Sequence, residues 1–136
     1  MWLGCVPESR KLSFPGPLSY TDPAMDCLFC KIAAGVIPSK PLYQDEQCYA
    51  FSDINPQSPV HFLVIPRQHI PSAAHAGPEH AALLGHLLVT AAQIAQDKGL
   101  EKGYRVVINT GPDGGQTVDH LHLHVLGGRH HTWPPG

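Results

Sequence analysis

The chain has 136 residues, of which 43% are hydrophobic and 15% are charged, a composition typical of one globular domain with one core. Its formal net charge of −2 gives no electrostatic basis for holding a nucleic-acid polymer or an anionic membrane. No apolar run approaches the roughly 18 residues that span a bilayer, so we expect a cytoplasmic protein.

The first predicted segments are an irregular leader and a short helix. Residues 1–24 contain several prolines and no apolar period, which indicates a leader before a domain that covers residues 25–136. Residues 26–35 are predicted to form a short helix. Asp26 can cap its N-terminus, and Gly35 can end it in the left-handed conformation.

Three strands are predicted next. Residues 42–44 and 48–52 flank a short turn, and residues 60–66 form the most apolar strand of the chain. We therefore expect residues 60–66 at the centre of the sheet. His61 lies in this strand, where it is either a core histidine with one hydrogen bond or a member of a functional site.

The second half of the chain begins with the longest predicted helix. Apolar residues recur at helical spacing between residues 79 and 98, after Pro78, which suits the first position of a helix. A strand over residues 104–109 follows, and the last strand comes after a glycine-rich turn. The order of these elements predicts an α+β fold with a mainly antiparallel five-stranded sheet, one long helix and one short helix.

Three histidines alternate with apolar residues near the C-terminus, in the order His120-Leu121-His122-Leu123-His124. Successive side chains of a β-strand point to opposite faces, so the histidines are predicted to share one face of a strand. Such a row of imidazoles can bind a metal, transfer protons or attack phosphorus as a nucleophile. Strict alternation makes three merely solvated histidines the weaker interpretation.

A glycine-rich segment lies just before the histidines. Residues 109–117 read Asn-Thr-Gly-Pro-Asp-Gly-Gly-Gln-Thr, and glycines let backbone N–H groups approach an anion closely. By itself the segment is typical of a flexible turn. Its position before the three histidines favours a phosphate-binding loop.

The row of histidines and the two apolar residues after it resemble the motif of the histidine triad (HIT) superfamily of nucleotide hydrolases and transferases. The flanking Gly-Gly-Gln-Thr, the Leu-Gly-Gly-Arg after the triad and the terminal Trp-Pro-Pro-Gly resemble the Hint branch, the purine nucleoside phosphoramidases. The resemblance runs from about Met25 to the last residue. It implies the HIT fold, with the sheet extended across a homodimer. It also implies small purine nucleoside monophosphate derivatives as partners.

The resemblance implies covalent catalysis through the middle histidine. His122 would attack phosphorus through a ring nitrogen and form a nucleotidyl-histidine intermediate, which water then hydrolyses. A backbone carbonyl or a water molecule would hold the other ring nitrogen. The phosphate oxygens would be stabilised by His124, by the Gln116 side chain and by backbone N–H groups from Gly115 to Val118. The implied substrates are adenosine phosphoramidate and adenylated lysine.

The same resemblance assigns residues to the leaving group and to the nucleoside. The hydroxyl of Thr117 would donate to the leaving nitrogen. Asp53 matches an acidic position that accepts the ribose hydroxyls, and Ile54 would cover the base. Asn109 matches a position near the ribose and the phosphate. Trp133 matches a terminal residue that reaches the site of the partner subunit.

Two cysteines, Cys27 and Cys30, are three positions apart, which alone fits a redox pair, half of a metal site or two buried thiols. Some HIT proteins and related nucleotidyl transferases have a similar pair that binds zinc. In them a histidine after a Pro-basic-x motif and the first triad histidine complete the site. His69 and His120 match these two positions. The resemblance therefore implies a structural zinc and no catalytic metal, and it leaves the other two triad histidines for chemistry.

Three alternatives stay open on the sequence alone. A nucleotide-binding regulatory module with slow turnover would keep the fold and the pocket. A dinucleoside polyphosphate hydrolase would keep the covalent chemistry on a different substrate. A metallohydrolase would use His120, His122 and His124 as catalytic zinc ligands and would leave the two cysteines without a role.

Overall fold

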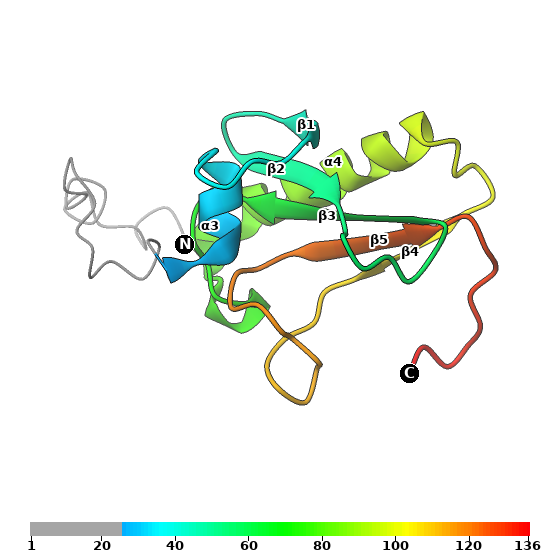
Figure 1. Ribbon diagram of the computed structural model, residues 1–136. Helices are drawn as coiled ribbons and strands as arrows, with labels where there is room; N and C mark the ends of the chain where they lie inside the picture. Colours follow the sequence, from blue (N-terminus) through cyan, green and yellow to red (C-terminus); the bar gives the residue numbers. More distant parts are fainter. Residues whose placement is uncertain (1–25) are drawn as a thin grey trace.

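The computed structural model describes residues 26–136, and the predicted leader over residues 1–24 lies outside the described residues. The described residues form one antiparallel five-stranded sheet with a short helix on one face and a long helix on the other (Figure 1). The predicted α+β fold with this number of strands and helices is therefore confirmed.

The sheet consists of β1 (Pro41–Gln44), β2 (Cys48–Ser52), β3 (Val60–Pro66), β4 (Tyr104–Val107) and β5 (Leu123–Gly127). Their order across the sheet is β1-β2-β3-β5-β4, and every neighbouring pair is antiparallel. β3 lies at the centre, as its apolar sequence predicts. β1 and β4 are the two edges of this sheet, so β4 presents an unpaired row of backbone groups.

The short helix α3 (Leu28–Ala33) is shorter than predicted. Its cap is Cys27 rather than Asp26, because the sulfur of Cys27 accepts the backbone N–H of Cys30 at 3.4 Å. Gly35 follows the helix with a φ of +78°, the left-handed conformation predicted for it. The cysteine pair therefore lies at the start of α3.

The long helix α4 (Ala81–Asp97) begins two residues later than predicted. The chain before it forms two short 3-10 turns, η2 (Ala73–His75) and η3 (Pro78–His80). In η3 the ring nitrogen Nδ1 of His80 accepts the backbone N–H of Gly77, so this turn closes before the α-helix starts. Within residues 26–136, no helix is both long enough and apolar enough to cross a membrane.

Alternation along the strands divides the core into two clusters, one on each face of the sheet. The cluster under α4 contains Cys48, Ala50, Phe62, Val64, Leu121, Leu123 and Val125, packed against Leu87, Ala91, Ile94 and Ala95 of the helix. The cluster under α3 contains Tyr49, Phe51, Leu63 and Ile65, packed against Phe29, Ile32 and Ala33. Both helices therefore hold the sheet through side chains that alternate along the same strands.

Candidate active site

The three triad histidines do not all lie on one strand, and this corrects the prediction. β5 begins at Leu123, so only His124 belongs to the sheet. Before that point the backbone N–H groups of His120 and Leu121 bond to loop carbonyls and not to β3. The alternation of faces nevertheless holds, because Leu121 and Leu123 are each 1% exposed in the cluster under α4, whereas the histidine rings lie on the opposite face.

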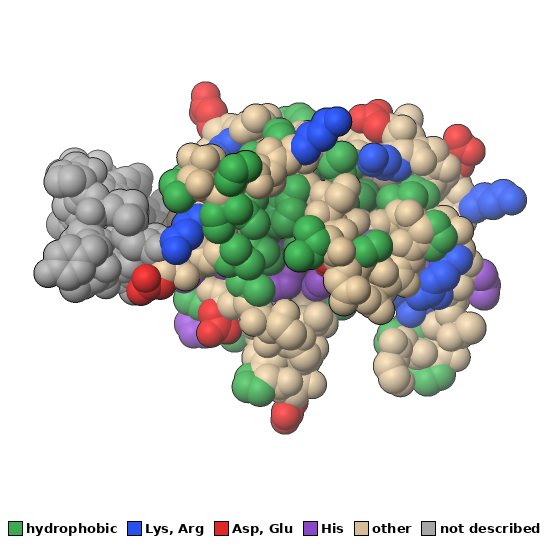
Figure 2. All heavy atoms as spheres, in the orientation of Figure 1, with side chains coloured by type: hydrophobic (Ala, Val, Ile, Leu, Met, Phe, Trp, Pro, Cys, Tyr) green, Lys and Arg blue, Asp and Glu red, His purple; other side chains and the backbone are tan. Residues whose placement is uncertain are grey.

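Histidine side chains gather at the centre of the face that α3 covers, beside a hydrophobic patch (Figure 2). The ring of Phe29, in α3, contacts the rings of His120 and His122 edge-on, with centroids 5.9 Å and 5.1 Å apart. The rings of His122 and His124 contact each other in the same way at 4.9 Å. One face of the sheet thus brings the triad and the first helix together.

The middle histidine is held in one tautomer. Nδ1 of His122 lies 2.6 Å from the backbone carbonyl oxygen of His120, so Nδ1 carries the proton and donates it. The His122 residue is 4% exposed. Nε2 therefore keeps its lone pair, and His122 presents one nucleophilic nitrogen without needing a base.

The third histidine is oriented by His61. The backbone N–H of Gln57 donates to Nδ1 of His61 at 3.0 Å, so His61 carries its proton on Nε2. This Nε2 lies 2.9 Å from Nδ1 of His124, so the Nε2–H group of His61 donates a hydrogen bond to Nδ1 of His124. His124 therefore carries its own proton on Nε2. Of the two roles that the sequence leaves open for His61, the structure favours membership of the site.

Burial keeps these two rings neutral at physiological pH. Burial, followed by the proximity of His122 and His61, lowers the pKa of His124 to about 4, although the Asp53 carboxylate acts in the other direction. Burial also lowers the pKa of His61, again against the effect of Asp53. His124 is therefore a neutral N–H donor and not a cation.

Asp53 lies beside this histidine pair. Its Oδ1 accepts the backbone N–H of Asn55 at 2.8 Å, and its Oδ2 lies 3.3 Å from Nε2 of His61 and 3.9 Å from Nδ1 of His124. The Asp53 side chain is 18% exposed and the neighbouring Ile54 is 99% exposed. The structure thus brings Asp53 close to the triad, with an exposed apolar residue next to it.

The glycine-rich loop is braced by Gln116. The side-chain oxygen of Gln116 accepts the N–H of Gly111 at 2.9 Å, and its amide nitrogen donates to the carbonyls of Pro71 at 2.7 Å and Val118 at 3.0 Å. In this arrangement the amide holds the loop against the segment after β3. Its contact with a phosphate oxygen stays a prediction.

Three glycines in this loop have conformations or contacts that a side chain does not tolerate. Gly111 and Gly115 have φ values of +73° and +82°. A Cβ atom on Gly114 would lie 2.5 Å from the carbonyl oxygen of Thr110. Thr117 is exposed and Asn109 is half-buried. The contacts of these two residues with a nucleotide stay predictions.

The C-terminal tail runs beside the end of the sheet. Arg105 of β4 donates to the carbonyl of Thr132 at 2.8 Å, and the hydroxyl of Ser58 lies 3.2 Å from Nε2 of His131. Trp133 is 82% exposed. Its contact with a partner subunit stays a prediction.

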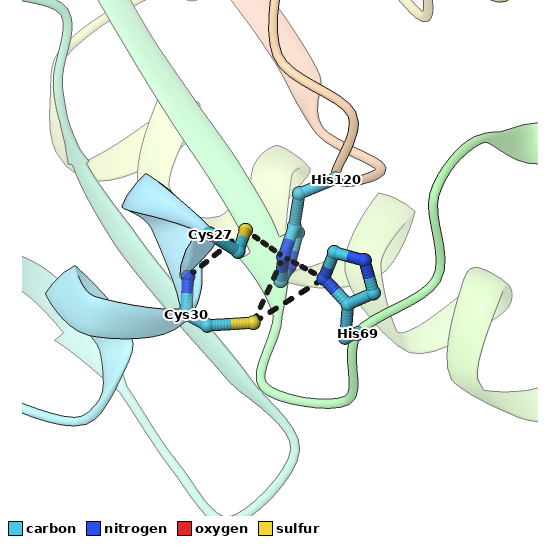
Figure 3. A group of neighbouring side chains, drawn as sticks. All are labelled: Cys27, Cys30, His69 and His120. Atoms are coloured by element: carbon cyan, nitrogen blue, oxygen red, sulfur yellow. Dashed lines mark hydrogen bonds between the residues drawn. The ribbon is translucent and has the colours of Figure 1, made fainter. Parts of the chain in front are cut away.

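The two cysteines at the start of α3 lie close to two histidines in a compact cluster (Figure 3). The sulfur and Nδ1 atoms of Cys27, Cys30, His69 and His120 all lie within 4.8 Å of one another. The Nδ1 atom of His120 is 3.3 Å from the Cys27 sulfur and 3.5 Å from the Cys30 sulfur. The Nδ1 atom of His69 is 3.3 Å from the Cys30 sulfur and 3.3 Å from Nδ1 of His120.

This donor set fits a tetrahedral metal ion. Zinc bonds of about 2.3 Å to sulfur and about 2.0 Å to nitrogen put neighbouring ligand atoms roughly 3.3–3.8 Å apart in a tetrahedron. Nε2 of His120 donates to the carbonyl of Pro66 at 2.8 Å, so the lone pair of His120 is on Nδ1, which faces the sulfurs. Two ring nitrogens and two sulfurs thus converge with the appropriate tautomer at His120.

Two other groups of metal-binding residue types lie within residues 26–136, and neither has this chemistry. In the group of Asp53, His61 and His124, Nε2 of His61 carries a proton and has no lone pair for a metal. In the group of Asp45, Cys48 and His86, burial raises the pKa of the Cys48 thiol to about 11, which keeps the sulfur protonated.

The fold and the three clustered histidines define a histidine triad protein. The HIT domain family model matches residues 34–131, and the chain belongs to the HIT family.

Similar proteins agree with this assignment. A HIT-like protein of Synechococcus elongatus is 58% identical over 111 residues, which cover 82% of this chain and 97% of that protein. The crystal structure of a HIT family hydrolase from Legionella pneumophila has a TM-score of 0.79 and 50% identity, and the match covers 81% of this chain and 99% of that one. A histidine triad protein from Clostridium difficile has a TM-score of 0.76 and 45% identity, over 78% of this chain and 93% of that one.

Proposed function

We propose that the protein is a nucleotide hydrolase of the Hint branch that cleaves the P–N bond of purine nucleoside phosphoramidates, such as adenosine phosphoramidate and adenylated lysine. The observation that carries this proposal is the hydrogen bond from Nδ1 of His122 to the carbonyl of His120, which leaves Nε2 as a nucleophile next to the N–H donor of His124. The similarity to a HIT family hydrolase supports the reaction class.

In the proposed first step, Nε2 of His122 attacks the α-phosphorus, and the P–N bond breaks. The leaving amine takes a proton, for which the Thr117 hydroxyl is the proposed donor. The ring of His122 becomes positively charged as the new bond forms, so the hydrogen bond from Nδ1 to the His120 carbonyl strengthens. His124 donates from Nε2 to a phosphate oxygen, whose charge increases in the transition state.

In the second step, water attacks the phosphorus of the nucleotidyl-histidine. The water gives up one proton, which restores the Thr117 hydroxyl that was deprotonated in the first step. His122 leaves as a neutral imidazole with its proton still on Nδ1, and the products are a nucleoside monophosphate and the free enzyme. The backbone N–H groups of the braced loop, from Gly115 to Val118, are proposed to stabilise the phosphate in both steps. This role requires the loop to be rigid, and the three hydrogen bonds of Gln116 support that rigidity.

The nucleoside is proposed to bind between Asp53 and α3. The Oδ1 atom of Asp53 accepts the N–H of Asn55 and its Oδ2 lies 3.3 Å from Nε2 of His61, and the remaining lone pairs of this carboxylate are proposed to accept the ribose hydroxyls. The apolar residues Phe29, Ile32 and Ile54 are the proposed surface for the base. Asn109 is proposed to contact the sugar and the phosphate from the opposite side.

We further propose that Cys27, Cys30, His69 and His120 bind a structural zinc ion. Its coordination bonds would link the start of α3, the segment after β3 and the triad. Four protein ligands leave no open position, so this metal would take no part in the reaction. The metallohydrolase alternative has less support. In residues 26–136 the three triad rings do not form a group that converges on one ion.

The zinc proposal has a direct test. The purified full chain is dialysed against a weak chelator and its zinc content is measured, with the Cys30→Ser variant and a Cys48→Ala control. We expect about one zinc per chain in the wild type and the control and little in Cys30→Ser. Equal metal content in all three proteins would contradict the proposal.

A homodimer in the cytoplasm is the proposed form of the protein. β4 is an edge strand of the sheet, and Tyr104 in this strand and Ile108 just after it are 39% and 41% exposed. Leu88 and Val89 of α4 are 48% and 56% exposed. A second copy that pairs with β4 would cover apolar side chains and bring Trp133 towards the neighbouring site.

A substrate comparison tests the proposed activity. Adenosine phosphoramidate, adenylated lysine and a dinucleoside polyphosphate are each incubated with the wild type, with His122→Ala and with His75→Ala, a matched control at an exposed histidine. We expect the phosphoramidates to be the better substrates and only His122→Ala to be inactive. A preference for the dinucleotide would favour the alternative hydrolase. Tight AMP binding without turnover would favour the regulatory module.

A further inference from the structure

The nucleophile is held by a residue whose side chain belongs to the cysteine–histidine cluster. The carbonyl of His120 accepts the Nδ1 proton of His122 at 2.6 Å. The ring of the same residue is fully buried and meets the sulfurs of Cys27 and Cys30 at 3.3 Å and 3.5 Å. One residue thus carries both the backbone carbonyl that fixes the His122 tautomer and a ring in contact with the two sulfurs.

A second physical link runs through Phe29, which stands between the two cysteines in the sequence. Its ring contacts His122 at 5.1 Å and His120 at 5.9 Å between centroids. Phe29 lies in the first turn of α3, and the Cys27 sulfur caps this turn by accepting the N–H of Cys30. A displacement of the Cys27 sulfur would change this turn and with it the contact between Phe29 and His122.

We propose that Cys27 and Cys30 form a reversible oxidation site whose state controls the orientation of the His122 ring. The two sulfurs lie within 4.8 Å of each other, and both cysteines are half-buried, so that a small oxidant can reach them. Residues three apart at a helix start are within the Cα separation that a disulfide spans. Only the effect on turnover rests on the proposed function, because the ring orientation is a property of the protein itself.

The oxidation is a two-electron reaction with a peroxide. The two thiols lose two electrons and two protons and form one S–S bond, and hydrogen peroxide takes both electrons and both protons to become two water molecules. With a metal ion bound, the two sulfurs would react as thiolates and the two protons for water would come from the solvent; the disulfide would then no longer supply thiolate ligands. A dithiol reductant reverses the reaction.

The disulfide would withdraw both sulfurs from the ring of His120 and remove the cap of α3. His120 would keep the hydrogen bond to Pro66 but lose its contacts with the cluster. Its carbonyl and the ring of Phe29 would then no longer hold His122 in one orientation. We expect turnover to fall about tenfold or more, the effect of losing one charge-assisted hydrogen bond.

The test uses the full chain with a Cys5→Ser substitution, which removes the cysteine outside the described residues. Limited hydrogen peroxide is added, and peptide mapping by mass spectrometry locates the disulfide. The readout independent of activity is the ¹H–¹⁵N spectrum of the His122 ring, which reports the tautomer. Turnover of adenosine phosphoramidate is measured on the same samples, before oxidation and after oxidation and re-reduction.

We expect a Cys27–Cys30 disulfide, a changed His122 ring spectrum and a reversible loss of turnover of about tenfold or more. The Cys48→Ala control should respond in the same way, since Cys48 lies in the other core. The Cys30→Ser variant should show the same spectrum and turnover with and without peroxide. An unchanged His122 spectrum in the disulfide form, or the absence of this disulfide, would overturn the proposal. A reduced protein without phosphoramidase activity would instead overturn the proposed function, while the spectrum still tests the switch.

Discussion

The assignment of His61 as the residue that orients His124 makes a quantitative prediction for His61→Ala. The substitution removes the hydrogen bond of 2.9 Å between the two rings and frees Nδ1 of His124. In the proposed transition state His124 donates to a negatively charged phosphate oxygen, and a hydrogen bond to such a charged chain is worth about 1.5–3 kcal/mol. Loss of about 1.5–2 kcal/mol of transition-state stabilisation lowers kcat by about 10–30-fold. KM changes little, because the phosphate oxygen that His124 would contact carries less charge in the ground state and makes less use of the bond.

The assay combines steady-state kinetics with an NMR determination of the His124 tautomer. His75→Ala serves as the control, because His75 is exposed and its ring nitrogen Nδ1 bonds to the hydroxyl of Ser72. We expect His124 to change from a single Nε2–H tautomer to a mixture in His61→Ala and to stay unchanged in the control. A folded His61→Ala protein with full kcat, or with His124 still in the Nε2–H tautomer, would refute the reasoning.

Three further predictions concern stability, pH and the loop. Arg67→Ala should lower the free energy of unfolding in urea by about 2–3 kcal/mol, because the guanidinium group donates to two backbone carbonyls and one side-chain amide. Partial burial raises the pKa of Asp45. This effect is outweighed by the hydrogen bonds that Asp45 accepts from Gln47, His86, Tyr43 and Cys48, which hold its pKa well below the usual range. The resulting stability is present above pH ~4 and is lost as the pH falls further, so the urea midpoint should fall with acid less in Asp45→Asn than in the wild type. Gly114→Ala should raise KM for adenosine phosphoramidate about tenfold, because the added Cβ meets a backbone oxygen at 2.5 Å and distorts the loop.

The fold could be predicted from the sequence because its signals are local. The apolar run of β3 marks the centre of the sheet, and the helical spacing of leucines marks α4. The predicted starts of the two helices differ from the observed ones, because side-chain hydrogen bonds decide where each helix begins. Cys27 caps α3 through its sulfur, and His80 closes a 3-10 turn before α4 starts.

The triad segment shows the limit of periodicity as a predictor of strands. Alternation correctly separates the buried leucines from the histidines. It does not reveal that the backbone at His120 bonds to a loop, because this depends on where the neighbouring strand ends. The departure from the sheet lets the ring of His120 reach the carbonyl of Pro66 and the cysteines.

The sequence does not decide between the two roles of His61, because the partner of His61 lies 63 positions away in the sequence. The available signal was the pairing of β3 with β5, in which Leu63 lies opposite His124. His61 shares a face with Leu63, so an assumed register would have pointed it towards the triad. The bracing role of Gln116 had no such signal, because its partners at Pro71 and Gly111 belong to irregular loops.

The most direct test of the account is the capture of the covalent intermediate on His122. The wild type is mixed rapidly with adenosine phosphoramidate and denatured in alkali, in which a phosphorus–imidazole bond survives, and the adduct is located by peptide mass spectrometry. The account predicts one nucleotidyl group on His122, absent in His122→Ala and reduced in His61→Ala. An adduct on another residue, or steady turnover without any adduct on His122, would contradict it.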